Sequence, residues 1–402
     1  MKPQRSTGNH QRGIKYTVTN LIFKVASGLN AILPSLNIIS LCSTPDYTDS
    51  AKSLFDYLNQ KNRRERIPVM VWHVKDARTV QSIYEKQVTY NKKALIVKKN
   101  RILSFLLFCL SKYIVDTHGL YSAVKLKNTQ KSLYLTHGMP VKKFGFEYDN
   151  DIQIGVQHAD YALATSPFYR DVISRSMGIE IQNVYPFGLP RNDIFFREDG
   201  KEEIIRSRLS QRYIVYLPTY RVSNDHNKNN GIDLSLGDRV FGGTKVEWAK
   251  LNEKLAELQT KIVIKPHPLE LHNDLSNLSG LSQVIIINDD WIIKNDFSLN
   301  LILKYSSALI TDYSGAYVDY LLTDNPIIFF IPDYDDYKES RGYVLDDFLE
   351  RLPGMKTTSF TDIGELLEKD ECAKKREEAR QLLNTQMTGD ASEKVYDLLF
   401  KQ

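Results

Sequence analysis

The chain has 402 residues, of which 42% are hydrophobic and 25% charged, with 20 Gly and 14 Pro. This composition is typical of a globular protein and excludes a disordered or fibrous chain, and at roughly 150 residues per domain the length predicts two domains. The cysteines Cys42, Cys109 and Cys372 are odd in number and far apart. They match neither a disulfide framework nor a zinc pattern, so we expect a reducing compartment.

The net charge of +4 is divided unevenly along the chain. Residues 1–190 hold 26 Lys+Arg and 13 Asp+Glu, a net charge of +13, whereas residues 191–402 hold 27 and 36, a net charge of −9. A basic half suits nucleic acid, an anionic membrane or a phosphorylated substrate, and chance placement of solvated charge is the alternative. Because no run of 18 apolar residues and no signal-peptide cleavage site occur, we expect neither a spanning helix nor secretion.

The first predicted element is an amphipathic helix that begins at Ile14 and ends before Pro34. Apolar residues recur at three- and four-residue spacing as far as Leu33, while Lys15 and Lys24 occupy other positions on the helical wheel. Next to a basic leader, such a helix either lies in a membrane interface or packs on the core of the protein, and the sequence leaves both interpretations open.

Short β-branched runs then alternate with helical patterns. We expect strands at residues 36–42, 69–72, 94–97, 113–117, 133–136, 161–165 and 184–187, with helices at 49–60, 102–111 and 169–177. After a Pro- and Gly-rich segment, strands follow at 214–217, 261–265, 283–287, 308–311 and 326–331, with helices at 247–259, 297–304 and 314–322 and a closing charged helical run at 374–400. This alternation predicts an α/β protein with two doubly wound parallel sheets that face each other across a cleft.

His137 is the first candidate for chemistry, because it is expected just past a buried strand. Gly138 follows it and permits a tight turn or a close approach of a ligand, and Lys142 and Lys143 add positive charge. A histidine at the carboxyl end of a strand can act as a general base near neutral pH, and a histidine that caps a turn is the alternative.

Further cationic residues come directly after other predicted strands. Arg191 lies at the crossing between the domains, where it forks onto a phosphate or pairs with an acid of the hinge. Thr219 and Arg221 are expected to project into the cleft, where a diphosphate is a natural partner for a cation. Lys265 and His267 end another strand, and the two prolines that flank His267 stiffen the backbone, so we expect both residues to contact phosphate.

The strongest local pattern is the abrupt change from a strand to a helix at Ser314 and Gly315. Hydroxyl and backbone N–H groups in such a first turn point at an anion, and ordinary N-capping by Ser314 is the alternative. Asp319 accepts hydrogen bonds either from a ribose or from Arg341. The sequence contains no cluster with metal-ligand spacing, no Walker loop and no Rossmann fingerprint, which favours a metal-independent reaction at a diphosphate.

Seven short motifs follow one another in a fixed order along nearly the whole chain. They are Thr136-His137-Gly138-Met139-Pro140-Val141-Lys142-Lys143-Phe144-Gly145; Ala159-Asp160-Tyr161 through Ser166-Pro167-Phe168; Gly188-Leu189-Pro190-Arg191-Asn192-Asp193; Pro218-Thr219-Tyr220-Arg221; Lys265-Pro266-His267-Pro268; Thr311-Asp312-Tyr313-Ser314 with Asp319-Tyr320; and Arg341-Gly342-Tyr343. In this order they resemble the CDP-glycerol glycerophosphotransferase family of teichoic acid synthesis. Pro45-Asp46-Tyr47-Thr48-Asp49 is similar to that family's first strand-helix junction.

The resemblance implies a GT-B-like fold. Residues 1–34 then form the basic leader and membrane-associating helix, residues 35–190 an acceptor domain, residues 191–375 a CDP-donor domain, and residues 376–402 a helix that returns to the N-terminal domain. His137 would deprotonate an acceptor hydroxyl, which attacks the β-phosphorus of a CDP-alditol so that CMP leaves. His267 is the second catalytic candidate, and with Arg221 and Lys265 it would stabilise the diphosphate without a metal or cofactor.

The remaining assignments divide between donor and acceptor. Those for the donor and its phosphates are Gly138, Arg191, Thr219, Arg221, Lys265, Thr311, Asp312, Ser314, Gly315, Asp319 and Arg341. Those for the acceptor and membrane side are Lys15, Lys24, Lys142 and Lys143.

Three residues depart from the pattern of the family. Gly315 stands where a second Ser is frequent, Tyr220 where a Trp is frequent, and Met139 where a Thr is usual. These differences leave the reaction type intact but leave the donor open between CDP-glycerol and CDP-ribitol. The chain also lacks the long N-terminal extension of the large polymerases, so a primase, a single-addition enzyme or a compact capsule polymerase fits better.

The expected partners are a lipid-linked or polymeric glycan acceptor and an anionic membrane surface on the cytoplasmic side of a bacterial cell, with the basic half facing the lipid. A homo-oligomer stays open, and nucleic acid is not expected, because basic repeats interleaved with aromatic residues are absent. The alternatives are a GT-B glycosyltransferase or a nucleotide-sugar epimerase that uses a UDP-sugar, and then a membrane-surface module without enzymatic activity.

Overall fold

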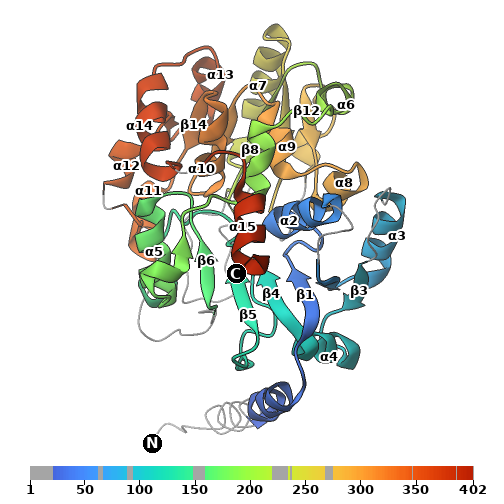
Figure 1. Ribbon diagram of the computed structural model, residues 1–402. Coiled ribbons are helices and arrows are strands. Elements are labelled where there is room, and N and C mark those ends of the chain that lie inside the picture. The colour runs from blue at the N-terminus through green and yellow to red at the C-terminus, as the bar shows by residue number, and fades with distance from the viewer. Residues whose placement is uncertain are drawn as a thin grey trace, which may run out of the picture.

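The computed structural model describes residues 21–61, 67–87, 94–147, 159–219, 234–235, 238–267, 275–345, 347–385 and 387–401. These residues form two parallel sheets, one above the other in Figure 1, with helices on their faces. The prediction of an α/β protein with two doubly wound sheets is therefore confirmed.

The N-terminal sheet has seven strands in the order β3-β2-β1-β4-β5-β6-β7, and each neighbouring pair is parallel. The strands are β1 (Leu36–Cys42), β2 (Val69–Val74), β3 (Leu95–Lys98), β4 (Ser111–Asp116), β5 (Lys131–Tyr134), β6 (Tyr161–Leu163) and β7 (Val184–Tyr185). Ile39 and Val115 are fully buried, as expected for a parallel sheet with helices on both faces. The strand order reverses between β1 and β4, so their carboxyl ends form a topological switch point.

The C-terminal sheet repeats this topology, with the strand order β12-β11-β8-β13-β14-β15 and parallel pairing throughout. Its strands are β8 (Tyr213–Leu217), β11 (Lys261–Ile264), β12 (Val284–Ile286), β13 (Leu309–Thr311), β14 (Ile327–Phe330) and β15 (Met355–Thr357), and a short hairpin joins β9 (Arg239–Val240) to β10 (Gly243–Thr244). Its switch point lies at the carboxyl ends of β8 and β13.

Helices cover the faces of both sheets. They are α2 (Asp49–Gln60), α3 (Ala77–Gln87), α4 (Ile102–Leu110), α5 (Pro167–Met177), α6 (Glu202–Arg208), α7 (Lys245–Glu257), α8 (Asp289–Lys294), α9 (Leu299–Lys304), α10 (Ala316–Tyr320), α11 (Tyr334–Arg341), α12 (Phe348–Arg351), α13 (Ile363–Leu366), α14 (Ala373–Leu383) and α15 (Ala391–Phe400). Local sequence sets several ends: Ser166 caps α5 before Pro167, Gly178 ends that helix with φ of 65°, and Thr244 and Glu247 form a capping box on α7.

The closing part of the chain differs from the sequence-based expectation. The single helical run expected at residues 374–400 is two helices, α14 and α15, because the chain turns between them at Gly389, where φ is 78°. The second helix lies on the N-terminal domain: Tyr396 contacts Tyr57 of α2 with ring centroids 6.3 Å apart, and Phe400 contacts Tyr113 of β4 at 4.8 Å. The end of the chain thus packs on the domain in which the described residues begin (Figure 1).

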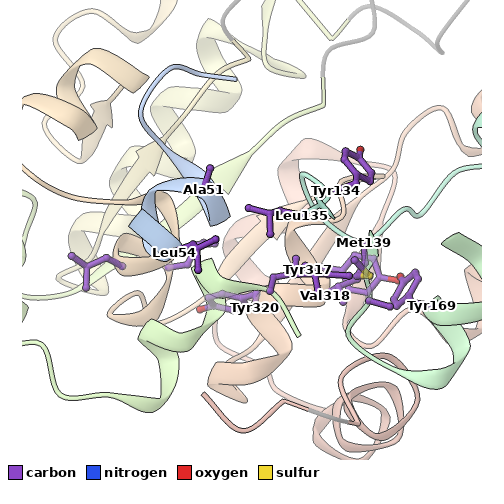
Figure 2. Packing of buried hydrophobic residues seen from close by; sticks show 14 of the residues in the cluster. Ala51, Leu54, Tyr134, Leu135, Met139, Tyr169, Tyr317, Val318 and Tyr320 are labelled. Carbon is purple, nitrogen blue, oxygen red and sulfur yellow. The ribbon is translucent and has the colours of Figure 1, made fainter. Parts of the chain in front are cut away.

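The two domains share one buried apolar cluster. Figure 2 shows Leu54 of α2 and Met139 and Tyr169 of the N-terminal domain in the same cluster as Tyr317 and Val318 of α10. The contact is close, because a Cβ added to Gly315 would lie only 2.3 Å from the Met139 carbonyl oxygen.

The loop after His137 extends this contact between the domains. The backbone N–H of Val344 donates to the Val141 carbonyl over 2.9 Å, and that of Lys143 donates to the Gly342 carbonyl over 3.3 Å. These bonds, and the bridge between Lys142 and Tyr343, fix the loop to the C-terminal domain.

Residues 21–32 form a helix at the lower end of Figure 1, and one of its faces packs on the N-terminal domain. Asn30 is buried and donates to the Lys125 carbonyl over 3.0 Å and to Gln130 Oε1 over 2.8 Å. Much of its apolar surface nevertheless stays exposed, at Leu21, Ile22, Val25, Leu29 and Ile32. Among the described helices, none is long and apolar enough to cross a membrane.

Candidate active site between the two sheets

A cavity of about 410 Å³ lies between the two sheets. The loop after β1, the start of α2 and the loops after β4 and β5 line one side, and Lys265, α8 and α9 line the other. Ligands of doubly wound proteins bind outside the carboxyl ends of the strands at the switch point. This cavity is therefore the candidate active site.

His137 lies in this cavity, three residues after the end of β5. Its ring is exposed to the cavity, and its Nδ1 lies 3.1 Å from the hydroxyl oxygen of Tyr134. Desolvation by the cavity walls lowers the pKa of His137; the charge of Asp49 opposes this effect and that of Arg191 reinforces it. The imidazole is consequently neutral at neutral pH, as a general base requires.

The backbone around His137 adopts conformations that most residues avoid. Thr136 has φ of 57° and Gly138 has φ of 131°. A β-branched residue in the left-handed region is strained, and strain of this kind is concentrated at functional sites. The Thr136 hydroxyl is also buried and finds no hydrogen-bond partner among the described residues. The strained turn aims His137 into the cavity.

His118 lies beside His137, although it is not among the residues predicted from the sequence. The centroids of the two rings are 4.5 Å apart and the ring planes are tilted by 30°. Thr117 Oγ1 lies 2.8 Å from His118 Nδ1. The sequence contains a pattern that marks this pair of histidines. The parallel neighbours β4 and β5 are both followed by Thr-His-Gly, at residues 117–119 and 136–138.

Arg191 joins His137 to both domains. Its Nη1 donates to the His137 carbonyl and to Asp49 Oδ1, each over 3.0 Å, and its Nη2 donates to Asp319 Oδ2 over 2.6 Å. The sequence left a phosphate or an acid open as the partner of Arg191, and the structure shows two acids, Asp49 and Asp319. The side chain of Arg191 also lines the cavity. Burial opposes the charge of this guanidinium, and the two carboxylates raise the pKa of Arg191 above its ordinary value.

Asp319 is buried and faces the hinge. Besides Arg191 it binds Asn192, whose Nδ2 donates to Asp319 Oδ1 over 2.7 Å, and Asn192 Oδ1 accepts from Asn300 Nδ2 over 2.6 Å. The structure thus turns this carboxylate toward Arg191 and Asn192. Asp49, Asn192 and Asn300 were not singled out as members of the site, because polar residues on separate elements show no common sequence pattern.

Lys265 and His267 follow β11 on the side of the cleft opposite His137. Lys265 lines the cavity and its Nζ lies 3.0 Å from Asp289 Oδ1 of α8. His267 is exposed, and partial desolvation followed by the charge of Lys265 lowers its pKa. Lys265 therefore faces the base across the cavity, whereas His267 does not line it.

Thr219, Thr311 and Asp312 do not line the cavity. Thr219 and Asp312 bind each other at the switch point of the C-terminal sheet, where the Thr219 N–H donates to Asp312 Oδ2 over 2.9 Å and its hydroxyl donates to Oδ1. The Thr311 hydroxyl donates to the Leu217 carbonyl over 3.0 Å. These bonds join the ends of β8 and β13.

The turn at Ser314 begins a helix of only five residues, α10. Ser314 Oγ accepts from the Ala316 N–H over 3.3 Å, within the turn before the helix. The N-cap of α10 is Gly315, and no side chain caps this helix, so the expected capping by Ser314 is not observed. Gly315 lies against the carbonyl of Met139, so this part of the turn contacts the N-terminal domain.

Lys142 Nζ donates to the Tyr337 hydroxyl over 3.3 Å, Lys143 is half-buried, and Lys24 is exposed on the helix of residues 21–32. Lys15, Arg221 and the side chain of Arg341 lie outside the described residues. Within the described ranges, no group of three His, Cys, Asp or Glu side chains could hold a metal ion.

A family model described as CDP-glycerol:poly(glycerophosphate) glycerophosphotransferase matches residues 27–401, nearly the whole chain. The chain belongs to this family. The resemblance inferred from the seven motifs is thereby confirmed.

Curated members of the glycerophosphotransferase family are about one quarter identical to the chain. The teichoic acid glycerol-phosphate transferase of Staphylococcus aureus is 24% identical over 432 residues, which cover 96% of this chain and 100% of that protein. The teichoic acid ribitol-phosphate primase of Bacillus spizizenii is 25% identical, covering 70% of this chain and 72% of that protein. The chain spans less than half, 46%, of the teichoic acid poly(ribitol-phosphate) polymerase of the same organism, at 24% identity.

Solved structures of other proteins share the fold. The wall teichoic acid polymerase TagF, in a variant soaked with CDPG, superimposes with a TM-score of 0.74 at 20% identity, over 99% of this chain and 98% of that one. A UDP-GlcNAc 2-epimerase from Neisseria meningitidis bound to UDP-GlcNAc has a TM-score of 0.55 at 12% identity, over 91% of this chain and 100% of that one. The expected GT-B-like pair of α/β domains is confirmed.

Proposed function

We propose that this protein transfers glycerol phosphate or ribitol phosphate from a CDP-alditol to a hydroxyl of a lipid-linked or polymeric glycan, and releases CMP. The observation that supports this most is the position of a neutral histidine, His137, in a cleft whose opposite wall presents Lys265. The family to which the chain belongs and the names of its relatives point to the same class of reaction.

The proposed reaction assigns a step to each of these residues. His137 takes the proton of the acceptor hydroxyl, whose oxygen attacks the β-phosphorus of the donor. The bond between this phosphorus and the oxygen that bridges it to the α-phosphate breaks, and CMP leaves with the electron pair. Lys265 and His267 stabilise the charge that develops on the departing phosphate, so the catalysis rests on positioning and electrostatic stabilisation.

Arg191 holds His137 in position for this reaction. Because its guanidinium is bound by two carboxylates and the His137 carbonyl, it holds the base and does not supply charge to the phosphates. We assign it as a positioning residue. The closed contact at Gly315 and Met139 fixes the distance between the base and the donor domain.

We further propose that the lower end of the N-terminal domain in Figure 1 binds the cytoplasmic face of an anionic membrane. The exposed apolar face of the helix of residues 21–32 lies near that of α4, where Ile102, Leu103 and Leu106 are exposed, and both helices pack on the same small core. Between residues 95 and 131 the sequence has a single acid, Asp116, which is buried, and seven Lys and Arg. An apolar surface with basic flanks is typical of interfacial binding.

The proposed reaction is tested by incubating the full chain with CDP-glycerol, CDP-ribitol and several UDP-sugars in the presence of a lipid-linked glycan acceptor. We expect CMP release from at least one CDP-alditol, and a covalently extended acceptor. Release of UDP without CMP would support a nucleotide-sugar enzyme of the same fold and overturn the proposal. The preferred alditol then decides between glycerol and ribitol.

A further inference from the structure

The switch point of the N-terminal sheet presents two histidines where the reaction needs one base. β4 and β5 are parallel neighbours, with Val115 opposite Leu133 and Asp116 opposite Tyr134. Each strand is followed by the same three residues, Thr-His-Gly. Because the carboxyl ends of adjacent parallel strands lie side by side, the two histidines leave the sheet next to each other and enter the same cavity.

The contact between the two rings is direct. Their centroids are 4.5 Å apart, so the ring of His118 covers part of one side of the His137 ring. Each ring is also fixed by a neighbouring hydroxyl, with Thr117 Oγ1 2.8 Å from His118 Nδ1 and the Tyr134 oxygen 3.1 Å from His137 Nδ1. The pair is therefore an ordered arrangement at the wall of the cavity.

We propose that His118 is a positioning residue for the reaction: its ring holds the imidazole of His137 in place and keeps water from one side of it. This inference rests on the proposed function, in which His137 is the base. In this role, His118 affects the reaction only through the position and the protonation of His137.

The charged groups around the pair define what His118 does. Asp49 of α2 faces both rings and favours their protonated forms, whereas Arg191 disfavours them. The positive charge of Lys142 also disfavours protonation of His137, and that of Lys99 disfavours protonation of His118. Lys265 and Asp289 line the opposite wall of the cavity.

His118 itself remains neutral in the pH range of the reaction. Desolvation, and then the positive charge of His137, lower its pKa to about 4. A neutral ring next to the base excludes water without adding a charge. When His137 takes the proton of the acceptor, His118 does not compete for it.

The experiment compares the full chain with two substitutions, His118→Ala and His118→Phe. The pKa of His137 is read from the imidazole signals in NMR titrations without substrate, and the rate of CMP release is followed between pH 5 and 8. In His118→Ala, water reaches the uncovered side of the ring, so we expect the pKa of His137 to rise. A rise of one unit would lower kcat/KM about tenfold on the acidic side. In His118→Phe, an apolar ring still covers the base, and we expect both values to stay close to those of the unchanged protein.

A matched control is Ser122→Ala, in the same loop but outside this cavity. It should leave the titration of His137 unchanged, and a shift equal to that of His118→Ala would overturn the proposal. An unchanged pKa of His137 in His118→Ala would also overturn it. If the pKa shifts as expected but no CDP-alditol yields CMP, the pairing of the two histidines stands and the proposed reaction fails.

Discussion

Arg191 holds the backbone carbonyl of His137 with a hydrogen bond of 3.0 Å. The same guanidinium binds Asp49 at the start of α2 and Asp319 in α10, so one side chain ties the candidate base to both domains. All three acceptors need the planar fork of an arginine, because a lysine ammonium is a point donor on a flexible stem. The position of His137 therefore depends on how the two domains meet.

The first prediction is that Arg191→Lys impairs both stability and activity. The lysine keeps the charge but cannot satisfy three acceptors at once, and a buried acceptor without a partner costs about 1–3 kcal/mol. We expect the free energy of unfolding in urea to fall by about this amount, and CMP release to fall at least tenfold. The matched control is Arg175→Lys, because Arg175 lies in an exposed pair with Glu147. Equal effects of the two substitutions would contradict the role of Arg191.

The second prediction concerns His137→Asn. Removal of a general base reduces rates about 10²- to 10⁴-fold, so we expect CMP release to fall within this range. The ring is exposed to the cavity, and the melting temperature should therefore change little. Binding of the CDP-alditol, measured by calorimetry, should persist because Lys265 is untouched. Full activity of the variant would exclude His137 as the base.

The third prediction tests the contact between Gly315 and Met139. A Cβ at position 315 would lie 2.3 Å from the Met139 carbonyl oxygen, so Gly315→Ala forces the domains apart or strains both turns. We expect the unfolding free energy to fall by about 1–3 kcal/mol, as for other overpacked sites. Gly28→Ala is the control, because nothing lies within 4 Å of its Cβ position and alanine favours a helix. A similar loss of stability in Gly28→Ala would show that the contact is not the cause.

The fourth prediction concerns stability at acidic pH. His73 is fully buried between Ser40 and Ser104, and desolvation followed by the charge of Lys99 lowers its pKa to about 3. In the unfolded chain this pKa is about 6.5, so between these values the unfolded state binds more protons and the folded state loses stability as the pH falls. The contribution of His73 to this slope is up to about 1.4 kcal/mol per pH unit.

His73→Gln removes the titration and keeps hydrogen-bonding groups at this position. In urea unfolding at pH 5, 6 and 7, the variant should show a shallower dependence of stability on pH than the unchanged protein. Identical slopes would mean that other groups account for the acid sensitivity.

The fifth prediction tests the membrane-binding surface. Ile102 and Leu103 of α4 are 81% and 60% exposed, and aspartate at both positions would place two negative charges against anionic lipid. We expect sedimentation with vesicles of phosphatidylglycerol to fall several-fold, while transfer to a soluble acceptor continues. Val246→Asp is the control, since the exposure of Val246, 64%, lies between those of Leu103 and Ile102, but Val246 lies on α7 of the C-terminal domain. Unchanged sedimentation of the α4 variant would refute the proposal that this surface binds the membrane.

Most of the fold could be predicted from local sequence patterns. The strand at Leu36–Cys42 and the helix at Asp49–Gln60 have the bounds that hydrophobic periodicity predicted, because burial patterns of strands and helices are local properties. The positions of His137 and Lys265 after strands could be predicted for the same reason. The break at Gly389 was missed, although a glycine between two helical patterns can mark one. The structure adds that a side chain at this position would collide with Phe196.

The pairing of side chains depends on the folded arrangement of the chain. Arg191 and Asp319 are separated by 128 residues, and no local pattern distinguishes an acid from a phosphate as the partner of a cation. His118 and His137 meet because β4 and β5 are neighbours, although the repeated Thr-His-Gly already marked them. Partners of this kind depend on strand order and on the contact between domains, so they become visible only when the chain is folded.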